Sequence, residues 1–152
     1  MATFHFKYEA VLHQRQADED ECQRELAKHL RHHNIIRTQL QSTEQAFRDA
    51  RQQLTGGLVG HVDVERVRDF ARYSGQVTAQ ARQAMDQLQQ IERRIDKARA
   101  DLAEAMRRRK AIQTLRDKHY QQWLAERKRR ETIELDELAV QRYARGLNVE
   151  SI

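Results

Sequence analysis

Apolar side chains recur every three or four residues along two long stretches of this chain, the spacing of one face of an α-helix. The first stretch runs from Leu12 to Leu54, and the second runs from Phe70 to Ile112. Because both follow a seven-residue repeat, they predict two helices that pack their apolar seams together as a coiled coil. Several seam positions are polar, among them Glu19, which weakens such a seam but fixes its register.

A glycine-containing segment separates the two patterns. Three of the five glycines lie between Thr55 and His61, and the chain contains no proline. Asp63 follows as a candidate N-cap, and Gly146 is a candidate helix stop before a frayed tail. We therefore expect an all-α fold, a single two-helix antiparallel coiled-coil hairpin over residues 1–152. The expected parts are a first helix over about 5–54, a loop over about 55–61 and a second helix over about 63–145.

The two expected helices differ in length. A turn near residue 58 places Phe4 beside Gln113, so the second helix extends about 30 residues, or roughly 45 Å, beyond the first. We expect this overhang to cover about 114–145.

The positive charge of the chain lies in the same region. Residues 107–152 carry twelve basic and seven acidic side chains, which accounts for the whole net charge of +5. A basic overhanging helix that also bears Trp123 and Leu135 predicts a surface for another molecule; the alternative is a frayed, solvated end.

The composition argues against an enzyme. Charged residues make up 34% of the chain and hydrophobic residues 39%, which is typical of long helices with a thin core and no deep substrate cavity. Cys22 is the only cysteine, so no intramolecular disulfide is possible. The chain has no run of about 18 apolar residues and no apolar signal segment, so we expect a cytoplasmic protein.

The histidines are the strongest candidates for a metal site. His29 and His33 have the i, i+4 spacing that can share a metal ion, with His32 beside them. No carboxylate accompanies them in an HExxH arrangement, so we expect packed or partly exposed seam histidines instead. The glycines near residue 57 do not form a phosphate-binding motif, because no lysine and serine follow. We expect no metal, no cofactor, no small-molecule substrate and no catalytic residue.

Two basic clusters, at 107–110 and 127–130, could contact phosphates. However, four acidic residues follow within the stretch 131–137. Charges of both signs in adjacent turns favour a protein surface over a nucleic acid. Two alternatives stay open, a homodimeric coiled-coil scaffold and, more weakly supported, a basic helix that binds nucleic acid.

Two segments resemble the FliJ-type proteins of the flagellar type III export apparatus. Residues 4–15 are similar to the aromatic-rich start of that family, which leads to a leucine and an arginine. Residues 126–139 are similar to its basic run followed by Leu-Asp-Glu. The length, the glycine-bearing break and the absence of proline agree over essentially the whole chain.

This resemblance implies a non-enzymatic hairpin similar to the central stalk of rotary ATPases. The open end of such a hairpin enters the hexameric export ATPase. The hairpin also engages the membrane export gate and escorts export chaperones, at the cytoplasmic face of the inner membrane. Carried onto this sequence, the resemblance implies that the ATPase is contacted by Phe4, Phe6, Trp123, Arg127, Arg129, Arg130 and Leu135. The implied gate-binding residues lie near the loop, on both arms: Leu40, Phe47, Phe70 and Val77. These four also occupy seam positions, so packing within the hairpin explains them equally well.

Overall fold

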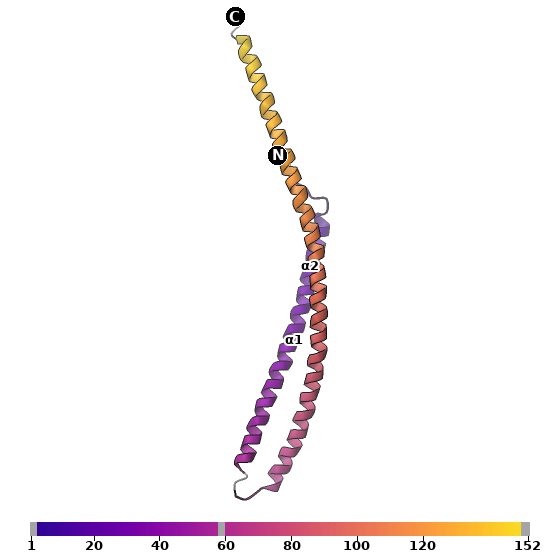
Figure 1. Cartoon of the computed structure of the whole chain (residues 1–152), viewed down its shortest axis with the longest axis vertical. Helices are drawn as coiled ribbons and strands as arrows, with labels where there is room; N and C mark the ends of the chain where they lie inside the picture. The colour runs from indigo at the N-terminus through magenta and orange to yellow at the C-terminus, as the bar shows by residue number, and fades with distance from the viewer. Residues whose placement is uncertain (1–2, 58–59, 150–152) are drawn as a thin grey trace. The chain divides into compact units, whose positions relative to one another are not determined.

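The structure is a computed structural model that describes residues 3–57 and 60–149. It contains two helices, α1 (Glu9–Gly56) and α2 (Val64–Val149), and no strand within the described residues (Figure 1). The expected all-α fold of two helices with a longer second one is confirmed.

The ends that flank the loop are capped. The backbone N–H groups of Glu65 and Arg66 donate to the Asp63 carboxylate over 3.0 and 3.4 Å, which confirms Asp63 as the N-cap of α2. Carbonyls of the last turn of α1 accept the Gly57 N–H at 3.2 and 3.1 Å. Gly60 has a φ of 110°, a backbone conformation that residues with a Cβ rarely adopt.

The outer ends of the helices differ from expectation. α1 begins at Glu9 rather than near residue 5, because the preceding residues leave the helix and bring Phe4 and Phe6 against α2. α2 continues through Gly146 to Val149 rather than ending at 145. A single glycine costs a helix only about 1 kcal/mol, which a helix of this length tolerates. Of the tail over 147–152 that we expected to fray, residues 147–149 are helical, and the last three residues lie outside the described part of the chain.

The contacts divide the chain into two compact units. The loop unit comprises Glu19–Ala105, and in it α1 and α2 run side by side in opposite directions (Figure 1). Its core contains Ile36 of α1 with Ile91 and Ile95 of α2, all buried. The partly buried side chains packed around this cluster are Leu26, Ala84 and Leu88. The core is a thin strip, as the composition predicts.

The terminal unit comprises Met1–Asp18 and Met106–Ile152. Phe6, only 3% exposed, is a core residue here, and its ring lies 5.6 Å from that of His119. Phe4 lies against Tyr120, with ring centroids 5.2 Å apart, so the expected pairing of Phe4 with Gln113 is wrong by seven residues. The physical reason is that a heptad pattern is unchanged by a shift of one heptad. The shifted register lets aromatic rings pack on one another instead of on a glutamine.

Candidate protein-binding surfaces

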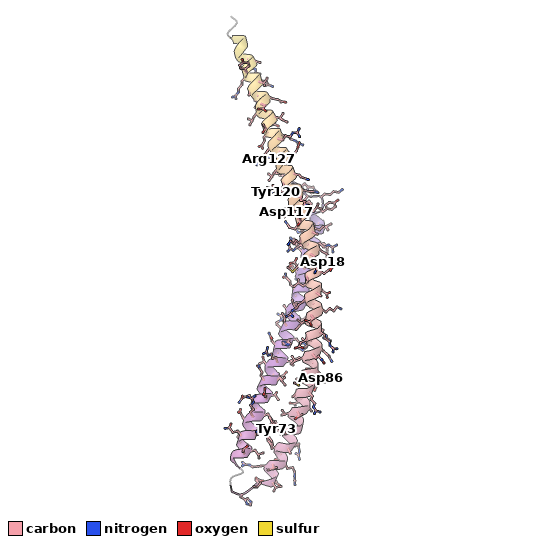
Figure 2. The ribbon with its side chains drawn as sticks, viewed as in Figure 1. Asp18, Tyr73, Asp86, Asp117, Tyr120 and Arg127 are labelled. Carbon is pink, nitrogen blue, oxygen red and sulfur yellow. The ribbon has the colours of Figure 1, made fainter. Side chains whose placement is uncertain are left out.

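An aromatic cluster forms where the N-terminal segment, residues 3–8, meets α2. The ring of Phe4 lies 5.2 Å from Tyr120 and 5.9 Å from Trp123, between ring centroids. Tyr120 and Trp123 stack on each other at 5.9 Å with 21° between their planes. Ring pairs of this kind contribute about 0.5–1.5 kcal/mol each beyond the area that they bury. The cluster therefore holds the N-terminal segment on α2. Its Tyr120 is labelled in Figure 2.

An ion pair joins the start of α1 to the same part of α2. The Arg116 guanidinium Nε donates to a Glu9 carboxylate oxygen over 3.2 Å. Both side chains are more than a third exposed, so solvent screens the pair and it contributes only modestly to stability. Aromatic packing, more than charge, thus fixes where the N-terminal segment lies.

Beyond Leu124, α2 is bare. Every residue from 125 to 145, a segment we call the C-terminal arm, is exposed. The arm carries five large apolar side chains that are 46–72% exposed: Ile133, Leu135, Leu138, Val140 and Tyr143. The bare part begins later than the expected boundary near 114, because the N-terminal segment reaches Trp123. Because successive residues of a helix turn by about 100°, Leu135 and Leu138 lie on one side of the arm, and Ile133, Val140 and Tyr143 lie on the other. Exposed apolar side chains in this number are typical of a segment that binds another protein.

The charges of the arm begin beside the aromatic cluster. The Arg127 guanidinium lies over the Trp123 ring, 5.7 Å from its centroid, and its Nε donates to Glu131 over 2.8 Å. Arg130 donates to Glu126 over 3.2 Å. In each pair the two residues lie one helical turn apart and are solvent-exposed, so each pair contributes only about 0.3–0.5 kcal/mol. These side chains can therefore leave their present partners and pair with charges of another protein.

The structure divides the residues expected to face an ATPase into two groups. Phe4, Trp123 and Arg127 come together at the aromatic cluster. Arg129, Arg130 and Leu135 lie on the exposed arm.

Phe6 belongs to neither group, because it is buried in the terminal unit. Its burial gives it a packing role, and a contact between Phe6 and an ATPase stays a prediction. Tyr120 was not predicted from the sequence, although it lies three residues before Trp123 and therefore on the same helix face.

Aromatic rings also gather near the loop. Phe47 of α1 stacks on Phe70 of α2 at 5.6 Å and lies 6.4 Å from Tyr73, between ring centroids. Tyr73, which is labelled in Figure 2, was not predicted from the sequence as part of this surface. Leu40 and Val77, the other residues expected to contact an export gate, are half-buried. Leu40 lines a groove between the two helices together with Ala81 and Ala84. The structure thus brings Phe47 and Phe70 together. Packing within the hairpin accounts for their position, and binding of an export gate at these residues stays a prediction.

The seam histidines are partly covered and lie near carboxylates. His33 Nε2 is 3.7 Å from a Glu92 carboxylate oxygen on the opposite helix, and His29 Nε2 is 3.8 Å from Glu25 on its own helix. In the part of the chain that the structure describes, no three His, Cys, Asp or Glu side chains are grouped to hold a metal ion. Cys22 is a partly buried free thiol.

Hydropathy along the helices gives no sign of a membrane span. Across residues 3–57 and 60–149, neither helix includes a segment that is both long enough and apolar enough to cross a bilayer.

The sequence model of one protein family, described as flagellar FliJ protein, matches residues 4–148. This match covers nearly the whole chain, including the aromatic cluster and the C-terminal arm. Comparison with curated proteins and with solved structures gives no match.

Proposed function

The chain belongs to the family of the flagellar FliJ protein, and from this membership and the bare C-terminal arm we propose that it is a stalk that binds and regulates the export ATPase. The family is a non-enzymatic component of flagellar protein export. The open end of the hairpin, formed by the N-terminal segment and the C-terminal arm, enters the hexameric ring. The protein itself contributes no active site and acts by contact.

The exposed arm is the observation that carries this proposal. Five large apolar side chains on a segment that no other described residue of the terminal unit covers lose water only when another protein covers them. Leu135 and Leu138 supply apolar contact area, while Arg129 and Arg130 orient the arm and speed its association with an acidic surface. The arm therefore has the anchors and the charges of a protein contact.

Regulation follows from symmetry. A single helix inside a six-fold ring contacts the six subunits differently, so it favours different nucleotide states around the ring. This effect requires that the helix binds those states with different affinities, since a ligand shifts an equilibrium only through differential affinity. The stalk would thereby couple its own position to the order of ATP hydrolysis.

The direct test measures ATP hydrolysis by the cognate export ATPase with the purified full-length chain. The double charge reversal Arg129→Glu with Arg130→Glu should abolish stimulation of the ATPase at physiological salt. The matched control reverses Arg31→Glu and Arg37→Glu, two exposed residues of α1 in the loop unit, and changes the net charge equally. Stimulation that survives the first reversal, or that both reversals reduce alike, contradicts the proposal.

The remaining parts of the proposal concern the gate, the chaperones and the location. We assign the surface near the loop to the membrane export gate. This surface consists of the rings of Phe47, Phe70 and Tyr73 together with Leu40 and Val77. Export chaperones would be escorted by the same protein, which acts in the cytoplasm and is peripherally associated with the inner membrane. The rings of Phe47 and Phe70, stacked at 5.6 Å, support the gate assignment because they form an aromatic surface contributed by both α1 and α2. We expect Phe70→Ala to lose binding to the export gate in a pull-down. The same variant should still stimulate ATP hydrolysis by the export ATPase.

A further inference from the structure

The C-terminal arm carries a row of side chains, here called the seam, whose charge order is complementary to that of the same seam running in the opposite direction. Starting at Leu124, side chains on one helix face recur at spacings of four and three residues. The residues of this face are Leu124, Lys128, Glu131, Leu135 and Leu138. Basic residues at 127–130 are followed by acidic residues within 131–137. When two copies of the arm lie antiparallel, the basic part of each copy therefore lies beside the acidic part of the other.

We infer that two copies of this chain pair through their arms as an antiparallel, two-fold symmetric coiled coil centred near residue 130. In this register Leu124 of one copy faces Leu135 of the second copy. Lys128 faces Glu131 of the second copy in the same way. Two-fold symmetry makes each contact occur twice.

The flanking positions agree with this register. Arg127 and Glu134 lie on the same side of the seam, about two turns apart. Antiparallel pairing places Arg127 of one copy beside Glu134 of the second copy. Within the seam itself, Arg142 comes to face Asp117 of the second copy, and both of these side chains are exposed in the single chain. Opposite charges therefore meet at the seam and along its flank.

Parallel pairing does not have this property. It would place Lys128 against Lys128 and Glu131 against Glu131 at the centre of the seam. Like charges at facing seam positions destabilise a coiled coil, so the charge order selects the antiparallel arrangement.

The second copy is also the occupant that the size of the surface fits. From Asp117 to Arg142 the seam spans 26 residues, or roughly 39 Å of helix, which is short for a permanent dimer. We therefore expect a weak, reversible dimer in the micromolar range. The internal pair between Arg127 and Glu131 is exposed, so it exchanges readily for contacts with the second copy.

This dimer is independent of the proposed stalk function, but it covers Leu135, which the ring contact also uses. The two states therefore exclude each other. A copy held in the dimer is unable to enter the ring with its arm.

Sedimentation velocity of the full-length chain over a range of concentrations tests the inference. The natural chain should shift from monomer to dimer as its concentration rises. Lys128→Glu places two Glu–Glu contacts in the seam and should weaken association about tenfold. The double change of Lys128→Glu with Glu131→Lys restores opposite charges across the seam and should bring association back to within about threefold of the natural chain.

The matched control is Arg129→Glu, which changes the net charge by the same amount but lies on the helix side away from the seam. It should leave association unchanged, although the proposed ATPase contact uses Arg129, so the two proposals fail separately. A chain that stays monomeric throughout overturns the inference. So does equal weakening by Lys128→Glu and Arg129→Glu, or a double variant that remains as weak as the single one.

Discussion

Two segments of α2 carry similar pairs of branched apolar residues and have opposite fates. In the loop unit, Ile91 and Ile95 are 3% and 5% exposed, because Ile36 of α1 packs against them. On the C-terminal arm, Leu135 and Leu138 are 66% and 50% exposed. An apolar helical pattern therefore predicts that a face will be buried, but it does not say whether the same chain or another protein buries it.

The largest expected effect comes from truncating one residue in each segment. Ile95→Ala should lower the free energy of unfolding by about 2–4 kcal/mol, because it removes buried methyl groups and leaves a cavity. Leu138→Ala should change it by less than about 0.5 kcal/mol, because the side chain is exposed. Urea unfolding followed by circular dichroism measures both. Equal losses would mean that the arm is packed in the free protein.

A second comparison concerns the aromatic contacts of the two units. Phe4→Ala removes the ring that covers Trp123 and should cost about 1–2 kcal/mol of stability in the terminal unit. Since Trp123 is the only tryptophan, its emission should shift to the red and its quenching by acrylamide should increase. Phe47→Ala, which acts in the loop unit, is the control and should leave the emission unchanged. An unshifted spectrum in Phe4→Ala would contradict the covered position of Trp123.

The helix end beside the loop gives a smaller effect. Asp63→Ala should destabilise α2 by about 1 kcal/mol and speed hydrogen exchange at Glu65 and Arg66, because these amides lose their acceptor. Asp63→Asn keeps a capping oxygen and should stay close to the natural chain. Asp69→Ala, an exposed change further along the helix, serves as the comparison. Similar exchange rates in all three variants would rule out the cap.

The smallest effect is expected at the ion pair of the terminal unit. Glu9→Gln should cost less than about 1 kcal/mol and the cost should shrink at high salt, since both Glu9 and Arg116 are partly exposed. Thermal unfolding at low and high salt measures this. A large loss that salt does not alter would show that charge, and not the aromatic cluster, holds the N-terminal segment.

The sequence predicted the two helices and the Asp63 cap because both depend on local chemistry. Periodicity sets the helices, and a carboxylate before the first turn sets the cap. It did not predict the register of Phe4, because a repeat of seven residues looks the same after a shift of seven. Only the three-dimensional packing of Phe4 on Tyr120 distinguishes the two registers.

The surfaces were predicted unevenly for a similar reason. The exposed arm follows from unequal helix lengths and a local excess of basic residues, which the sequence displays. The burial of Phe6 and the contribution of Tyr73 do not, since they depend on which residues of the opposite segment lie within reach.

The proposal that the C-terminal arm is the ATPase contact is best tested by hydrogen exchange of the full-length chain, alone at low concentration and then with its export ATPase. We expect fast exchange over residues 125–145 in the free chain, strong protection there when the ATPase is added, and little change around Ile91 and Ile95. Protection of residues 125–145 in the free chain equal to that of the loop unit, or an arm that the ATPase leaves unprotected, would overturn the proposal.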